Sequence, residues 1–310
     1  MKLNKLILPL LASSFALTGC SALLSKIGIG GSSSVKKPTM SEKGGKVERT
    51  QFVTDWTKQM EEANLIYKSG QHYSSFDASN KTYSKEEEKN KRAGKVILNS
   101  TEEETSILSM KYDASSKVAK FETTYKESDK STTPYYTTNF KSENNYKGGY
   151  QYGKDSIYYI DDVEKKYRDY NMSYDSYDRD EWMDRVLYDQ MSSFFGEISY
   201  YFYNDKAEFY ERGSTYTVEI IENTAETEND YYLDVNYKLT YQMVFDGNNI
   251  VTRFIAELTR TLTYRKDATN GAYSSGDTEV AKDTTYGNAE LTFKSMSLKE
   301  TDVSSYTKNS

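Results

Sequence analysis

The stretch "YYLDVNYKLTYQMVFDGNN", residues 231–249, decides the fold. Apolar or aromatic residues occupy every odd position from Tyr231 to Phe245, and the positions between them include Asp234 and Lys238. This alternation predicts a β-strand with one buried and one wet face, because successive side chains of a strand point to opposite sides of the sheet. Asp246-Gly247 then favours a tight turn. The stretch therefore predicts the first half of a long antiparallel hairpin.

The flanking segments extend this pattern into a sheet. The second strand of the hairpin has its apolar residues at even positions: Ile250, Phe254, Ala256, Leu258, Leu262 and Tyr264. An earlier hairpin is predicted over 207–221, with its turn at Arg212-Gly213, and shorter strands over 96–170. Leu291 and Phe293 mark a last strand. Short connections between these strands make the sheet antiparallel.

Two amphipathic helices accompany the sheet, one at about 50–68 and one at about 178–200. Their apolar residues recur every three or four positions, so each helix has one apolar face. Each helix also contains one of the two tryptophans, Trp56 and Trp182. The polar segment 69–95 has no clear period, and we expect a loop there.

These elements predict an α+β fold, in which a curved antiparallel sheet (a half-barrel) carries the two helices on its concave face. A single domain is expected over 47–298, followed by a polar tail over 299–310. Residues 20–46 are rich in Ser, Gly and Lys and predict a flexible tether.

The N-terminal stretch "LPLLASSFALTGCSALL", residues 8–24, contains Cys20, the only cysteine. Two lysines precede a short apolar run, which is the pattern of a secretory signal. Leu17-Thr18-Gly19-Cys20 resembles the bacterial lipobox. The resemblance implies that residues 1–19 are a signal peptide and that Cys20 carries a diacylglycerol. The expected localisation is therefore extracytoplasmic, with the chain anchored to the cell membrane by this lipid, and Cys20 is neither a nucleophile nor a redox group.

The charge balance argues against polyanionic partners. Removing Lys2 and Lys5 with the signal peptide changes the formal charge from −7 to −9. A mildly acidic surface repels phosphate groups, so binding to nucleic acid or direct electrostatic binding to a membrane is not favoured.

The order of helices and strands over about 50–298 is similar to that of half-barrel lipoproteins and lipoprotein carriers of the LolA and LprG type. The resemblance implies an apolar cavity between helices and sheet that can hold an acyl chain. The expected lining faces one side by helical or strand spacing and consists of Trp182, Val186, Phe194, Leu239, Tyr241, Phe254 and Leu258.

Residues suited to catalysis or metal binding are sparse. His72 is the only histidine, and no second histidine or thiol in the domain can share a zinc ion with it. The acidic clusters at 175–181 and 222–230 lack the ligand spacing of a calcium-binding loop. We expect no enzymatic activity, no metal and no cofactor.

Two functions remain open on these patterns. The first is a membrane-anchored lipoprotein that binds or carries an apolar, lipid-like ligand in its cavity. The second is a structural or interaction lipoprotein with a filled core that contacts an envelope protein. The tyrosines of residues 135–188 can serve either as core filling or as an aromatic binding surface.

Overall fold

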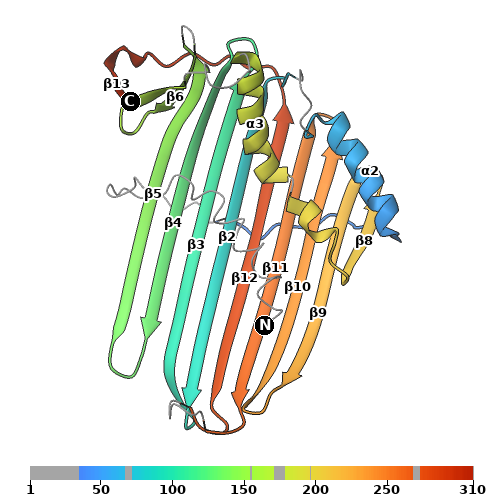
Figure 1. The fold of residues 1–310 in the computed structure, drawn as a ribbon, viewed down its shortest axis with the longest axis vertical. Coiled ribbons are helices and arrows are strands. Elements are labelled where there is room, and N and C mark those ends of the chain that lie inside the picture. The colour runs from blue at the N-terminus through green and yellow to red at the C-terminus, as the bar shows by residue number, and fades with distance from the viewer. Residues whose placement is uncertain are drawn as a thin grey trace.

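A single sheet dominates the computed structural model, which describes residues 35–66, 72–153, 156–170, 179–195, 197–267 and 273–309 (Figure 1). In spatial order, the 13 strands are β1 (Gly45–Val47), β8 (Ala207–Arg212), β9 (Thr215–Thr227), β10 (Tyr231–Asp246), β11 (Asn249–Tyr264), β12 (Thr278–Phe293), β2 (Phe76–Arg92), β3 (Lys95–Asp113), β4 (Val118–Thr132), β5 (Thr137–Tyr152), β6 (Ile157–Asp161), β7 (Lys166–Tyr170) and β13 (Thr307–Asn309). All neighbours are antiparallel except β7 and β13, which are parallel.

Two meanders make up this sheet, and β12 joins them. One meander runs from β8 to β12 and the other from β2 to β7, and β12 pairs with β11 on one side and with β2 on the other. The last long strand of the chain therefore lies in the middle of the sheet.

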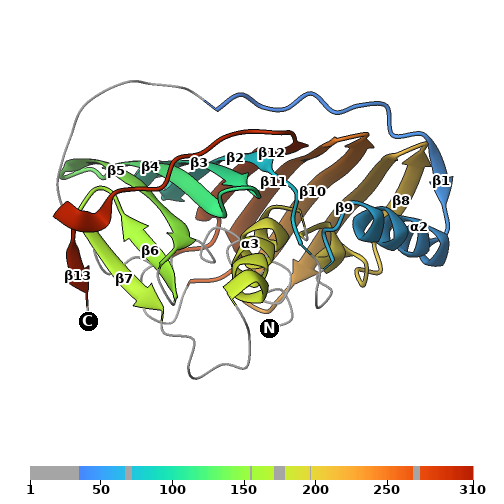
Figure 2. The same cartoon turned by 90° about the horizontal axis from the view of Figure 1, so that it is seen from above.

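Both predicted helices lie on one side of the sheet, which we call the front face (Figure 2). Helix α2 (Arg49–Glu62) buries Phe52, Trp56 and Met60 against aromatic residues of β8, β9 and the 3₁₀-helix η3 (Glu197–Tyr201) and its following turn. Helix α3 (Arg179–Phe195) buries a stripe of the same kind, formed by Met183, Leu187, Met191 and Phe195. The second short 3₁₀-helix, η4 (Val303–Ser305), precedes β13.

The predicted half-barrel is wrong. Strands account for 60% of the described residues and helices for 14%, and α2 and α3 cover only one end of the front face (Figure 1). The reason is length. β3 has 19 residues, or roughly 60 Å at about 3.3 Å per residue, whereas α3 has 17 residues and spans roughly 25 Å. The other half of the sheet therefore extends past the helices and is not covered by them.

The segment 69–95, predicted to be a loop, contains strand β2. Its sequence "TYSKEEEKNKR" (82–92) has polar residues at both odd and even positions, so apolar alternation could not reveal it. Full-length pairing with β3 and β12 fixes it as a strand. The prediction failed because this part of β2 has no apolar face.

The other side of the sheet, the back face, is crossed by residues 35–44, which we call the strap (Figure 2). Val35 accepts a hydrogen bond from the Tyr286 hydroxyl of β12, and Ser41 exchanges two hydrogen bonds with the Gln242 amide of β10. The strap thus covers Gln242, which the alternation assigned to the wet face and which is fully buried. Part of the predicted tether is therefore ordered against the sheet.

The hairpin predicted from residues 231–264 is confirmed. Leu239 lies opposite Ala256, and Tyr241 lies opposite Phe254, on the front face. Leu239 is fully buried and Lys238 is exposed.

Replacing Leu239 with alanine should therefore lower the free energy of unfolding by about 2–5 kcal/mol, through lost transfer energy and the cavity left behind. Lys238→Ala is the control on the opposite face and should change it by no more than about 0.5 kcal/mol. Urea unfolding of both variants gives the comparison. Equal losses would show that β10 is not buried on one face only.

Candidate functional site

The front face changes character along the strands, from apolar under the helices to acidic beyond them. The registers of β12, β2, β3 and β4 place side chains in rows that cross the sheet. The row under the helices is Leu291, Ala78, Met110 and Phe121. Eight residues further along each strand, the row is Asp283, Glu86, Glu102 and Asp129, which we call the carboxylate row.

Three more carboxylates flank this row on the same face. Glu104 and Glu127 are paired directly across β3 and β4, and Glu88 follows Glu86 by two residues on β2. Strands lie about 4.8 Å apart, so neighbouring members of these rows are close enough to repel one another. The described part of the chain forms no ion pair with any member of the carboxylate row.

The electrostatics of the row follow from this crowding. Partial burial, followed by the repulsion of Asp283 and Glu88, raises the pKa of Glu86, although Arg260 opposes the rise. Burial and the charges of Glu104 and Glu86 raise the pKa of Glu102. Burial also raises the pKa of Asp283. The row therefore carries negative charge at neutral pH at a cost to the folded state.

The back face of the same strands is different, because lysines alternate with the front-face acids and are paired locally. The Lys126 Nζ lies 3.1 Å from a Glu143 carboxylate oxygen, and the Lys147 Nζ lies 2.6 Å from one of Glu122. Each pair joins β4 to β5 in direct register. The sheet thus has lysines that are paired locally on its back face, whereas its front face has a row of carboxylates that no described ion pair neutralises and that Arg260 opposes in part.

His72 is part of a small polar cluster beside α3. Its Nδ1 lies 2.7 Å from Oδ2 of Asp184, which is buried, and Oδ1 of Asp184 accepts the Tyr73 backbone N–H at 3.3 Å. Within the described ranges, no serine, threonine or cysteine side chain hydrogen-bonds to His72. The pair therefore anchors residues 72–73 to α3 and lacks the nucleophile of a hydrolytic triad.

The residues predicted to line a cavity are spread over the sheet. Trp182 packs beside Tyr150 of β5, with 6.5 Å between ring centroids, whereas Leu239 and Tyr241 are buried on β10. Val186 and Leu258 are half-buried on α3 and β11. Phe194 lies outside the residues whose side chains the structure describes, and Cys20 with its lipobox lies outside the described residues altogether.

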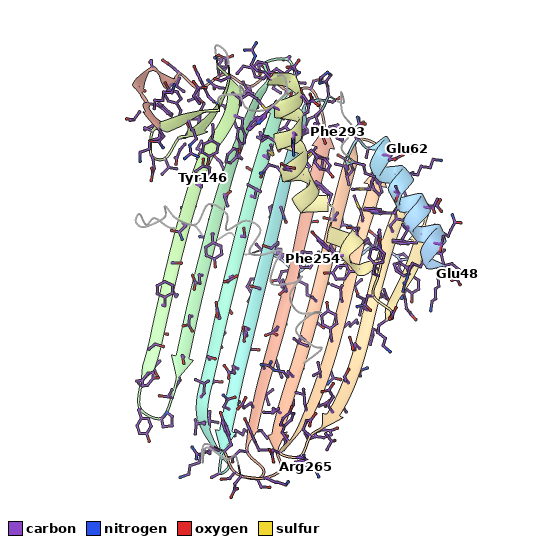
Figure 3. The ribbon with its side chains drawn as sticks, viewed as in Figure 1. Glu48, Glu62, Tyr146, Phe254, Arg265 and Phe293 are labelled. Atoms are coloured by element: carbon purple, nitrogen blue, oxygen red, sulfur yellow. The ribbon has the colours of Figure 1, made fainter. Side chains whose placement is uncertain are left out.

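Phe254 occupies space where a cavity was expected (Figure 3). Its ring stacks on Tyr241, with centroids 6.1 Å apart and planes 10° from parallel. The same ring lies over Gly287 of β12, where a Cβ atom would come within 2.4 Å of it. Glycine at 287 therefore lets the ring lie flat on the sheet.

Two hollows are described, and neither includes a predicted lining residue. The first, about 430 Å³, lies between the β5–β6 turn and residues 300–303, where the Gln151 amide exchanges two hydrogen bonds with Thr301. The second, about 240 Å³, borders the acidic rows and includes Glu88, Arg260 and Glu279. Whether an apolar cavity forms between α3 and the hairpin stays a prediction.

Neither a metal-binding cluster nor a membrane-spanning helix is found among the described residues. They contain no group of three or more His, Cys, Asp or Glu side chains arranged to hold a metal ion. None of their helices has the length and apolarity needed to cross a bilayer.

The carboxylate row was missed by sequence reasoning, although a signal is present. Acidic residues recur two positions apart at Glu86 and Glu88, Glu102 and Glu104, and Glu127 and Asp129. Spacing by two puts both members of a pair on one face of a strand. Recognising this required β2 to be a strand and the registers to be known.

Comparison with known proteins gives no family. No family model matches the chain, and no curated protein matches it. Among solved structures, it is similar to Pseudomonas aeruginosa OccK2 (OpdF) at 8% identity and a TM-score of 0.21, covering 69% of this chain and 98% of that one. The β-domain of the Bordetella autotransporter BrkA matches at 11% identity and a TM-score of 0.17, covering 70% and 99%. An outer-membrane channel from Pseudomonas putida matches at 5% identity and a TM-score of 0.19, covering 71% and 97%.

Similarities this weak carry no inference about the function of this chain. The structures found include an outer-membrane channel, and none is described as a lipid-anchored chain, so the localisation and lipoprotein character predicted from Cys20 find no support among them. The lipid-anchored extracytoplasmic assignment is therefore corrected and is not taken further.

The raised pKa values make a prediction about pH. A carboxyl group whose pKa is raised by folding stabilises the fold fully below its ordinary pKa, which is 4.5 for a glutamate, and this contribution is lost as the pH rises through the raised value. Glu102→Gln removes the ionised group. It should raise the urea midpoint at pH 7, and the gain should disappear near pH 4.

Glu103→Gln is the matched control. Glu103 is the next residue on β3 and faces the back, opposite Lys85. Its loss should leave the midpoint unchanged or lower it. A higher midpoint for both variants at pH 7 would assign the effect to net charge rather than to the carboxylate row.

Proposed function

We propose that the protein is a non-catalytic interaction protein that binds a cationic partner, such as a lysine- or arginine-rich protein segment, on the carboxylate row. The observation that carries this proposal is the charge of the row, which no described ion pair neutralises, on a sheet face that no described element covers. A protein gains nothing in stability from such a row. A partner that supplies positive charge would relieve the repulsion and recover that cost on binding.

The surrounding surface supports a broad contact. The flanking carboxylates Glu88, Glu104 and Glu127 widen the row across three strands. The backbone there is fixed by pairing on both sides, so the acidic side chains are held in place before a partner arrives. This reduces the ordering cost of binding.

The absence of catalysis is part of the proposal. The carboxyl groups lie in rows on an open face of the sheet and do not converge in a cleft. Burial in a cleft is what usually shifts the pKa values of a catalytic acid and base. The His72–Asp184 pair supports no alternative, because no described nucleophile is hydrogen-bonded to it.

The packing of Phe254 favours surface interaction over carriage of an apolar ligand. Phe254 lies on Gly287 and against Tyr241, so the hairpin side of the expected cavity is occupied by the protein's own rings. This supports the reading in which partners bind to the surface.

A fluorescently labelled oligolysine peptide tests the proposal by fluorescence anisotropy. The parent protein should bind it at low salt and release it as salt screens the charges. The double substitution Glu86→Gln with Glu102→Gln should weaken binding about tenfold, since each exposed pair contributes up to about 1 kcal/mol.

The control removes the same two charges from the back face, as Glu87→Gln with Glu103→Gln. It should change binding far less, although the net charge is identical. Equal weakening by both pairs would mean that the peptide senses only overall charge, and the proposed site would then be wrong.

A further inference from the structure

The far end of the sheet, beyond the carboxylate row, is built from hairpin turns (Figure 1). The turns between β2 and β3, β4 and β5, β9 and β10, and β11 and β12 all lie at this end, and Arg265 marks it in Figure 3. We call the first two, residues 91–96 and 130–141, the docking turns. None of their residues belongs to the carboxylate row.

The docking turns expose large apolar side chains. Tyr135 is 93% exposed, Tyr136 is 60% exposed and Phe140 is 52% exposed, all in the β4–β5 hairpin. Val96 of the β2–β3 turn is 41% exposed. Adjacent exposed aromatic residues at the tip of a projecting hairpin have no role in the described core, and such patches mark contact with another surface.

Basic residues accompany these apolar groups. Lys91, Arg92 and Lys95 surround the β2–β3 turn, and no acidic residue occurs in the sequence from Lys89 to Thr101. Lys130 and Lys141 flank the β4–β5 turn. By contrast, the β9–β10 turn is acidic, and its Asp230 lies 4.0 Å from Lys266 of the β11–β12 turn.

Both docking turns are held in shape. The Ala93 backbone N–H donates to Oδ1 of Asp277 at 2.7 Å, and Oδ2 of the same residue accepts the Ser274 N–H at 2.8 Å, which ties the β2–β3 turn to β12. In the β4–β5 turn, the Thr133 hydroxyl accepts the Tyr136 N–H at 3.2 Å. The exposed rings are therefore presented by ordered turns.

We infer that the docking turns bind to the surface of an anionic lipid bilayer, with the strands projecting away from it. Tyrosine rings suit the boundary between headgroups and acyl chains, and lysine and arginine are attracted to anionic headgroups. A second copy of the chain fits the turns less well, because their positive charge would be opposed by the same charge on the copy.

The negative net charge does not oppose this contact. Asp129 adjoins the β4–β5 turn, where Lys130 and Lys141 oppose its charge. Glu86 and Glu102 are seven and eight residues from the β2–β3 turn at Ala93-Gly94, or roughly 25 Å along the strands at about 3.3 Å per residue. This is more than twice the Debye length of about 8 Å at physiological ionic strength. The expectation that this acidic chain avoids anionic membranes was based on its net charge. The structure places most of the acidic row apart from the basic turns, so the net charge does not describe the charge near the turns.

Flotation with vesicles tests the inference on the purified full chain. Vesicles of phosphatidylglycerol and phosphatidylcholine in equal parts should bind the protein at physiological ionic strength, and pure phosphatidylcholine vesicles should bind much less. Replacing Tyr135, Tyr136 and Phe140 with serine should lower the anionic-vesicle-bound fraction about fivefold, and so should Lys91→Gln with Lys95→Gln.

The controls change similar residues elsewhere on the surface. Tyr200→Ser with Tyr203→Ser removes two exposed rings from the region of η3, and Lys81→Gln with Lys282→Gln removes two back-face charges. Both should bind like the parent, and all variants should keep its urea midpoint. Equal binding to neutral vesicles, equal losses in test and control variants, or sedimentation showing self-association through the docking turns would overturn the inference.

Discussion

The structure depends on the backbone pairing of β12 with two strands at once. Each residue from Thr278 to Phe293 lies opposite a residue of β2, and all but the last lie opposite a residue of β11. One of these partners precedes β12 by almost 200 positions and the other is its neighbour in sequence. Without β12, the two meanders would be separate sheets with a long unpaired edge each. Such long-range pairing has a high cost in loop closure and is slow to form.

The two ends of the sheet are stabilised by different interactions. Under α2 and α3, buried apolar side chains provide the driving force. Beyond the helices, the strands rely on their hydrogen bonds, on cross-strand ion pairs of the back face and on stacked tyrosines such as Tyr83 with Tyr286. Tyrosine suits this role, because its ring packs on the pleated surface while its hydroxyl stays in water. An unusually tyrosine-rich chain can thereby keep a single layer of sheet ordered.

Sequence reasoning succeeded where one face of an element is apolar. The alternation of residues 231–264 predicted β10, β11 and the positions on each that face the core, and three- and four-residue spacing predicted both helices. It failed for β2, because a strand with both faces in water has no apolar period. The carboxylate row was out of reach for a related reason: Glu86, Glu102, Asp129 and Asp283 meet only through the registers of four strands. The half-barrel prediction failed because the apolar stripe of a helix indicates that the helix packs on a sheet but does not indicate how much of the sheet it covers.

Because of the strap, the response of the molecule to a pulling force depends on where and in which direction the force acts. Its contacts follow one another across the strands: Val35 meets Tyr286 of β12, Lys37 pairs with Glu257 of β11, Ser41 binds Gln242 of β10, and Lys43 pairs with Glu219 of β9. A pull on the chain before residue 35 would load these contacts one at a time and peel the strap from the back face. A pull along the strands would instead load many ladder hydrogen bonds together. The N-terminal side of the domain would therefore yield in small steps and lengthen under tension, while the sheet behind it stayed intact.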